Sequence, residues 1–182
     1  KHKPGPTVSN LSSSRALADV TAQHGQSYAA SAVGEVNVVE MMKATQAVIG
    51  GEGNGGIILP ESHYGRDALV GIALFLSHLA ELGKPKMSAL KASYPAYFMS
   101  KNKIQLSAGM DVDGILAQMK ERYASEKVKD IDGVKIDFDA QWVHLRKSNT
   151  EPIIRIYTEA KTQSEADQLA EKFVEEIQSL CS

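Results

Sequence analysis

The chain has 182 residues, of which 43% are hydrophobic and 23% charged, a balance typical of folded globular domains and not of disordered segments. Its 20 basic and 22 acidic residues give a net charge of −2, which offers no general positive field to nucleic acid or an anionic membrane. The one cysteine, Cys181, excludes an internal disulfide framework and a cysteine-based metal site. We therefore expect no nucleic-acid partner, and basic groups that act only locally.

Targeting signals are not evident. The longest apolar run is far shorter than the ~20 residues that cross a bilayer, which predicts no membrane partner. The opening "KHKPGPTVSN" has neither an initiator methionine nor the apolar core of a signal peptide. These features favour a cytoplasmic location. Because the chain begins abruptly beside a predicted strand, we also expect it to be a fragment of a longer protein.

The first half alternates short strand patterns with helical patterns. Ser12 or Ser13 is the expected N-cap of the first helix, Gly25 its stop signal, and Asp67 the expected cap of the third helix. In chain order the pattern predicts a strand at 6–10, a helix at 12–25, a strand at 26–30, a helix at 35–48, a glycine-rich loop leading into a strand at 49–61, and an apolar helix at 66–83. This alternation predicts a layered α/β domain with a mainly parallel sheet, residues 1–90.

The second half has a different pattern. Residues 84–103 read as a short helix and a connector, and a domain at 96–182 follows. Its predicted elements are strands at 103–108, 133–138, 141–146 and 152–160 and helices at 111–125 and 162–180. Strands joined by short turns predict an α+β domain with an antiparallel sheet and helices on one face.

The decapeptide "RKSNTEPIIR" concentrates cationic and small polar side chains between two predicted strands. Ser148, Asn149 and Thr150 are residues that favour turns, so we expect them at a hairpin tip, where backbone N–H groups can converge on an anion. Arg146 and Arg155 would flank the tip, and a guanidinium binds phosphate through two parallel hydrogen bonds. The competing interpretation, an exposed hairpin whose arginines pair with surface carboxylates, has equal weight from spacing alone.

The second cluster is "GGEGNGG". Gly51, Gly53 and Gly56 fit the G-x-G-x-x-G pattern of dinucleotide-binding loops, but that pattern should open a helix, and here it leads into a strand. Glu52 would also repel a pyrophosphate. A carboxylate and an amide on such a loop suit hydrogen bonds to sugar hydroxyls, which makes Glu52 and Asn54 candidates for sugar binding. Taken alone, a plain connecting loop is the favoured interpretation.

No metal site is expected. "DVDG" resembles the start of a calcium loop but lacks the later acidic ligands, so Asp111 is predicted to cap a helix instead. His24, His78 and His144 have no partner at ligand spacing and are expected to be structural or surface residues.

Taken together, "GEGNGG" and "RKSNTEPIIRIYTEA" resemble the α-D-phosphohexomutase superfamily, which includes phosphoglucomutases, phosphomannomutases and phosphoglucosamine mutases. The resemblance extends to "VGEVNVVEMMK" and to "DGVKI" followed by a tryptophan-containing strand. Members have four domains, and this chain looks like the third and fourth. The resemblance implies that the fourth domain is similar to the TATA-box-binding protein in fold.

The same resemblance implies roles for individual residues. Glu52 matches the sugar-binding glutamate, whereas Asn54 stands where the family usually has serine, which leaves the preferred sugar open. The implied phosphate-binding residues are Arg146, Ser148, Asn149, Thr150 and Arg155. Asn149 leans slightly towards the phosphomannomutase and phosphoglucomutase branch.

The reacting groups of the family do not match this chain. Members use a phosphoserine and Mg²⁺ held by a D-x-D-x-D-R motif, and neither a matching serine loop nor that motif occurs here. We expect no catalytic or metal-binding residue in this chain. The chain would be the inactive substrate-recognition part of an enzyme that interconverts hexose 1-phosphate and hexose 6-phosphate. Its expected partners are a hexose phosphate and the missing N-terminal domains. The alternative is a non-catalytic phosphosugar-binding or regulatory module.

Overall fold

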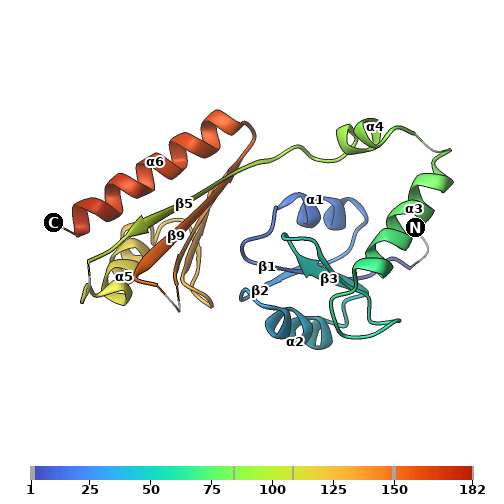
Figure 1. Ribbon diagram of the computed structural model, residues 1–182, viewed down its shortest axis with the longest axis horizontal. Helices are drawn as coiled ribbons and strands as arrows, with labels where there is room; N and C mark the ends of the chain where they lie inside the picture. The colour runs from blue at the N-terminus through green and yellow to red at the C-terminus, as the bar shows by residue number, and fades with distance from the viewer. Residues whose placement is uncertain (1–2, 84, 108, 149–150, 182) are drawn as a thin grey trace. The chain divides into compact units, whose positions relative to one another are not determined.

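A computed structural model describes residues 3–83, 85–107, 109–148 and 151–181. The chain folds into two compact units, Lys1–Ala96 and Tyr97–Ser182 (Figure 1). Each unit has its own sheet and its own hydrophobic core, and each is described separately. No described helix is long and apolar enough to cross a bilayer.

The first unit contains a four-stranded sheet in the order β2-β1-β3-β4. Strand β1 runs parallel to both β2 and β3, and only β4 is antiparallel to its neighbour. The strands are β1 (Thr7–Asn10), β2 (Tyr28–Ser31), β3 (Ile49–Glu52) and β4 (Gly56–Ile58). The prediction of a layered domain with a mainly parallel sheet is therefore confirmed.

Helices α1 (Ala16–Gln23) and α2 (Glu35–Thr45) lie on opposite faces of this sheet (Figure 1). Val38, Val39 and Met42 of α2 are buried against the sheet, and their helical spacing places them on one side of the helix. The α1 cap was predicted wrongly: the helix begins after Arg15, and no side chain caps it.

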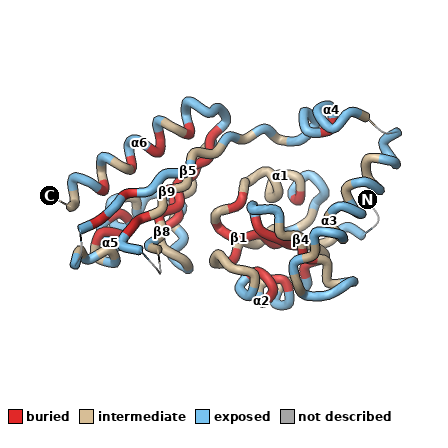
Figure 2. Tube along the Cα trace, in the orientation of Figure 1, coloured by how far each residue is buried: buried red, intermediate tan, exposed pale blue. Residues whose placement is uncertain are grey.

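Helix α3 (Ala68–Glu81) begins at Asp67, whose Oδ1 accepts a hydrogen bond from the Val70 N–H at 3.0 Å. The predicted aspartate cap is confirmed. Although α3 is strongly apolar, none of its residues is fully buried, and it contains none of the buried residues that are coloured red in Figure 2. A short helix, α4 (Met87–Ala92), follows and buries Leu90.

The second unit contains a five-stranded, fully antiparallel sheet in the order β5-β9-β8-β7-β6. Its strands are β5 (Phe98–Gln105), β6 (Lys127–Lys129), β7 (Val134–Asp137), β8 (Trp142–Lys147) and β9 (Ile153–Ala160). Strand β5 begins five residues earlier than the predicted strand at 103–108, inside the segment that we expected to be a connector. Its pairing along the whole of β9 explains the difference, because weak local periodicity does not reveal a partner strand.

Helices α5 (Val112–Arg122) and α6 (Gln163–Leu180) cover one face of this sheet (Figure 1). Their apolar residues share a single core with alternate residues of the strands, among them Leu145, Ile154 and Ile156. Asp111 caps α5 through the Gly114 N–H at 2.9 Å, as predicted. The predicted α+β arrangement is confirmed, and the strand residues between the core positions point to the opposite, helix-free face.

Candidate functional site

Glu52 is the last residue of β3 and stands at the entrance to a tight hairpin turn. A Cβ at Gly51 would lie 2.1 Å from the Gly56 carbonyl oxygen, so only glycine allows the two strands to come this close. Gly55 has φ +101°, which glycine tolerates best, and its N–H donates to the Glu52 carbonyl at 3.0 Å. The glycines therefore build a defined turn between β3 and β4, where the sequence alone favoured a plain connecting loop.

The Glu52 side chain is buried and held by groups from three other segments. Its Oε1 accepts hydrogen bonds from Asn10 Nδ2 at 2.8 Å and from the Gly34 N–H at 3.1 Å. Its Oε2 lies 3.8 Å from Arg66 Nη1. Because two donors and a cation face this carboxylate, its position is fixed in advance of any ligand.

A second layer of hydrogen bonds supports this arrangement from behind. Asn10 Oδ1 accepts from Ser13 Oγ at 2.9 Å and from the Ser12 N–H at 3.1 Å. Ser13 Oγ in turn accepts from the Gly53 N–H at 2.9 Å. Ser13 thus ties the β3–β4 turn to the end of β1 instead of capping α1, which is the physical reason for the incorrect cap prediction.

Arg66 is clamped by Glu35, the first residue of α2. The Arg66 backbone N–H donates to Glu35 Oε1 at 2.9 Å, and its Nε donates to Oε2 at 2.7 Å. These bonds, the backbone one above all, lower the pKa of Glu35 below its ordinary value, so that the carboxylate stays charged. A Cβ at Gly56 would lie 2.6 Å from Arg66 Cδ, so this glycine makes room for the arginine.

Glu35, Asn54 and Arg66 line a cavity of about 530 Å³ beside the turn, together with Gly55, Gly56 and Ala68. Asn54 is exposed, and its Oδ1 accepts from the Gly56 N–H at 3.3 Å. The structure therefore brings Glu52 and Asn54 together around Arg66. Sequence reasoning did not assign Asn10, Ser13, Glu35 or Arg66 to this site, since only the order of the strands brings them together.

The second candidate site lies on the helix-free face of the other sheet. Arg146 of β8 and Arg155 of β9 are directly opposite each other in the antiparallel register. Ser148 follows β8 and donates its N–H to the Ile153 carbonyl at 3.0 Å. Because strand residues alternate between faces, Arg146 and Arg155 lie on the face away from α5 and α6. Asn149 and Thr150 lie outside the described residues.

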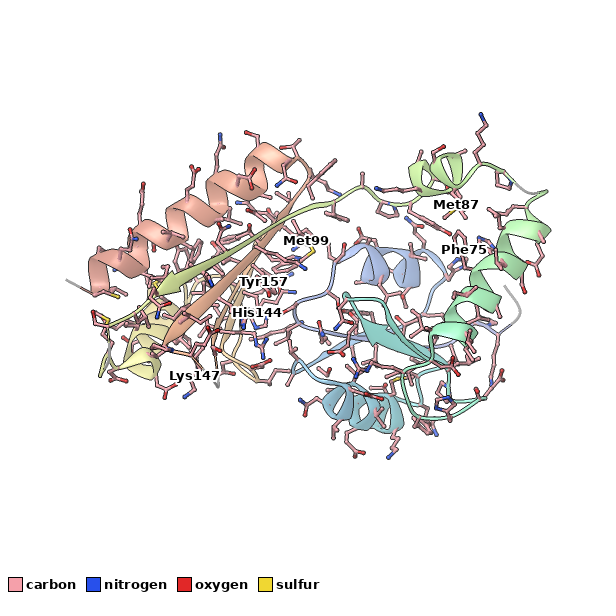
Figure 3. All side chains as sticks on the ribbon, in the orientation of Figure 1. Phe75, Met87, Met99, His144, Lys147 and Tyr157 are labelled. Carbon is pink, nitrogen blue, oxygen red and sulfur yellow. The ribbon has the colours of Figure 1, made fainter. Side chains whose placement is uncertain are left out.

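Lys147, by contrast, lies on the helix-covered face, although it is adjacent to Arg146 in sequence. Its Nζ is 2.7 and 2.8 Å from the two carboxylate oxygens of Asp113 on α5. Figure 3 labels it at the end of its strand. The cationic decapeptide is thus divided by the pleat of the strand: the arginines share one face, and the lysine forms an ion pair on the other.

Asp132, in the turn between β6 and β7, restrains Arg146. The Arg146 Nε lies 2.9 Å from Asp132 Oδ2, as an ion pair and not as an aligned hydrogen bond. The next residue, Gly133, has φ +66°, and a Cβ there would lie 2.1 Å from the Leu145 carbonyl oxygen. Arg155 forms no ion pair with any carboxylate in the described part of the chain.

His144 shares this face but adds no positive charge near neutral pH. Its Nε2 lies 2.7 Å from the Asp132 carbonyl oxygen, and burial lowers the pKa of His144 to about 4. The imidazole is therefore neutral and serves the turn as a hydrogen-bonding group. Within the described ranges, no group of three or more His, Cys, Asp or Glu side chains is placed to hold a metal ion.

The first unit is thus a mixed α/β unit with a buried glutamate at a glycine turn, and the second is an antiparallel unit with two arginines opposed across β8 and β9. Residues 1–97 match the family described as phosphoglucomutase/phosphomannomutase, alpha/beta/alpha domain III, and residues 101–176 match its C-terminal domain. The chain belongs to the phosphoglucomutase/phosphomannomutase family and corresponds to its third and C-terminal domains, as the sequence motifs predicted.

Individual relatives agree with this assignment. A phosphoglucomutase/phosphomannomutase of Thermococcus kodakarensis is 35% identical over 169 residues, which cover 92% of this chain and 36% of the relative. A phosphoglucomutase/phosphomannomutase family protein of Burkholderia thailandensis has the same fold, with a TM-score of 0.78 and 22% identity over 97% of this chain and 38% of the other. The chain thus spans little more than a third of the length of these proteins.

A more distant structure has the same fold as well. It is the Aspergillus fumigatus N-acetylphosphoglucosamine mutase in complex with GlcNAc-6P and magnesium. Its TM-score is 0.66, at 16% identity over 98% of this chain and 39% of the mutase.

Proposed function

We propose that this chain is the substrate-recognition part of a phosphohexomutase that interconverts hexose 1-phosphate and hexose 6-phosphate. The observation that carries the proposal is the direct pairing of Arg146 with Arg155 across β8 and β9, with Ser148 immediately after β8. Family membership supports the reaction class. We assign the phosphate of the substrate to the second unit and the sugar to the first.

The paired arginines suit a phosphate because they are like charges held directly opposite each other. Such a like-charge cross-strand pair is destabilising, and Asp132 offsets only the charge of Arg146. A phosphate monoester carries close to two negative charges at neutral pH and offers three acceptor oxygens. Each charge-assisted hydrogen bond contributes roughly 1.5–3 kcal/mol, and Ser148 adds a neutral donor. In our proposal Asn149 and Thr150 complete this phosphate site.

The glutamate turn suits the hydroxyl groups of a sugar. Glu52 Oε1 already accepts two hydrogen bonds, so Oε2 is the oxygen that we assign to a sugar hydroxyl. Asn54 borders the cavity that Glu35 and Arg66 line, and it offers both an acceptor and two donors. The Arg66 guanidinium partly neutralises the negative charge of Glu52 and orients its carboxylate.

This division of labour fits a mutase. The enzyme must hold a sugar phosphate in two orientations, so that O1 and O6 in turn reach the phosphoryl donor. A phosphate site made of guanidinium and hydroxyl groups recognises the phosphate whichever carbon bears it, and the glutamate turn holds hydroxyls between the two ends. Positioning and charge neutralisation supply most of the catalysis in phosphoryl transfer.

The reacting serine and Mg²⁺ are proposed to belong to the remainder of the parent protein, because the D-x-D-x-D-R motif is not in this sequence. Mg²⁺ would supply charge neutralisation at the transferred phosphoryl group. The residues of this chain bind and orient the substrate. We therefore expect the chain alone to bind sugar phosphates without turning them over.

The test is an NMR titration of the ¹⁵N-labelled chain with inorganic phosphate, glucose 1-phosphate and mannose 1-phosphate. All three ligands should shift amides around residues 146–155, and only the two sugar phosphates should shift those near Glu52. Arg146→Ala should abolish the first set of shifts. Lys147→Ala is the matched control, because it removes the same charge from the same hairpin but from the opposite face.

Equal losses in Arg146→Ala and Lys147→Ala would contradict the proposal, since they would show a general charge effect. Phosphate shifts without any sugar response at Glu52, combined with no hexose phosphate turnover by the parent protein, would favour the non-catalytic binding module.

A further inference from the structure

The sheet face that carries Arg146 and Arg155 extends to a third strand, because β5 pairs with β9. In the register, Lys103 of β5 is directly opposite Arg155 of β9, and Arg155 is directly opposite Arg146 of β8. Three cationic residues from three strands therefore form one row across the sheet. Lys103 precedes Arg146 by 43 residues and Arg155 by 52, so no local motif contains all three.

The three side chains lie on the same face. The neighbouring residues Ile104 and Ile154 are paired with each other and buried in the core beneath α5 and α6. Lys103 and Arg155 must therefore point to the opposite face, since successive strand residues alternate. Lys103 is exposed, and it makes no ion pair with a carboxylate among the residues that the structure describes.

The row carries an excess of positive charge. Directly opposed residues in antiparallel strands have Cβ atoms roughly 4.5–5.5 Å apart, and like charges in such pairs repel. Asp132 balances Arg146, which leaves two positive charges, those of Lys103 and Arg155, without a described carboxylate partner. A phosphate monoester dianion would neutralise both charges and relieve the repulsion along the row.

A comparison with Lys101 shows that the environment of Lys103 differs from that of another lysine on the same strand. Lys101 lies on the same strand and the same face as Lys103, but its register partner is Tyr157 instead of an arginine. Its Nζ lies 5.4 Å from the centre of the Tyr157 ring. This cation–π contact stabilises the ammonium group of Lys101. Tyr157, which is labelled in Figure 3, is two residues beyond Arg155 on β9 and therefore on the same face.

We propose that Lys103 is a third phosphate ligand, which contacts the phosphate monoester dianion together with Arg146 and Arg155. The inference rests on the proposed function of the hairpin and extends the site to a strand that the motif does not include. The ammonium group of Lys103 acts as a point charge at the edge of the site, while the arginines supply the directed, bidentate hydrogen bonds.

The test compares Lys103→Gln with Lys101→Gln in the 182-residue chain. The dissociation constant for inorganic phosphate and for glucose 1-phosphate is measured by NMR titration. Lys103→Gln should weaken binding of both ligands roughly threefold to tenfold, as expected for one exposed charge pair strengthened by its neighbours. Lys101→Gln should change it less than about twofold, and Lys103→Arg should restore most of the affinity. Amide shifts of α6 serve as the folding control.

Equal effects of Lys103→Gln and Lys101→Gln would overturn the inference, because both lysines would then act only through the general field. If Arg146→Ala abolishes phosphate binding while Lys103→Gln leaves it unchanged, the proposed function survives and Lys103 is not a ligand. If the unaltered chain binds neither phosphate ligand, the proposed phosphate site and the inference both fail.

Discussion

In our proposal, the two candidate sites recognise their ligands by different physical means. Around Glu52, buried hydrogen bonds from Asn10 and Gly34 fix one carboxylate before a ligand arrives. On the second sheet, Arg146, Arg155 and Lys103 lie on neighbouring strands, and of these three only Arg146 forms an ion pair with a described carboxylate, that of Asp132. Hydroxyl groups are distinguished by direction, so their site needs a rigid acceptor. A phosphate is distinguished by charge, so its site tolerates looser side chains.

Removing the Asn10 amide that donates to Glu52 should have the largest effect on the difference between the two sites. Asn10→Ala should lower the free energy of unfolding of the first unit by about 3 kcal/mol, because a buried carboxylate loses a charge-assisted donor. Amide signals of the first unit, followed through a urea titration, measure the loss. Sugar-specific shifts near Glu52 should weaken, whereas phosphate binding by the second unit should persist.

Asn37→Ala is the matched control, because it removes an exposed asparagine amide that donates only to the Val33 carbonyl at 2.9 Å. Its effect should stay within about 0.5 kcal/mol. A loss of the same size in both variants would mean that the Glu52 network is not a rigid site.

The pH dependence of stability tests whether His144 is neutral on the second sheet. Burial lowers its pKa to about 4, whereas the unfolded chain titrates near 6.5. The unfolded state therefore binds the proton first, and the second unit should lose stability as the pH falls from about 6.5 towards 4. Between pH 7.5 and 5 this group should account for about 2 kcal/mol. The single tryptophan, Trp142, lies on the same strand and reports unfolding by fluorescence.

His144→Gln should remove that part of the pH dependence, and His24→Gln, an exposed position in the first unit, should leave it intact. An unchanged slope in His144→Gln would mean that the imidazole already carries a proton in the folded state. The positive charge on the sheet face that carries Arg146 and Arg155 would then include the charge of His144.

Arg66 allows the smallest and most local test. Arg66→Gln keeps the backbone bond to Glu35 but removes the guanidinium, so the lowered pKa of Glu35 should rise part of the way towards its ordinary value. An NMR pH titration of the Glu35 carboxyl group measures the change. In Lys43→Gln, which removes a cation that pairs with Glu40 on the same helix, the pKa of Glu35 should not change.

If the pKa of Glu35 is the same in Arg66→Gln as in the unaltered chain, the guanidinium does not control the charge balance of the cavity. The assignment of the Arg66 guanidinium as the charge partner of Glu35 would then be wrong.

Local sequence was sufficient for much of the architecture. Alternating strand and helix patterns gave the layered first unit, and short turns between strands gave the antiparallel second unit. The caps at Asp67 and Asp111 followed from residue type and position. The α1 cap failed, because Ser13 is used by a long-range bond to the β3–β4 turn, and residue type alone cannot reveal such competition.

The sequence by itself determined which groups are available: a glutamate between glycines, and two arginines on either side of a turn. Only the tertiary structure decided their partners. The order β2-β1-β3-β4 brings Asn10 to Glu52, and α2 brings Glu35 to Arg66. The pairing of β5 with β9 places Lys103 beside Arg155, while the pleat of β8 turns Lys147 away. Local propensities act over a few residues, whereas these contacts join positions about 30 to 50 residues apart, and only the packed sheet brings them together.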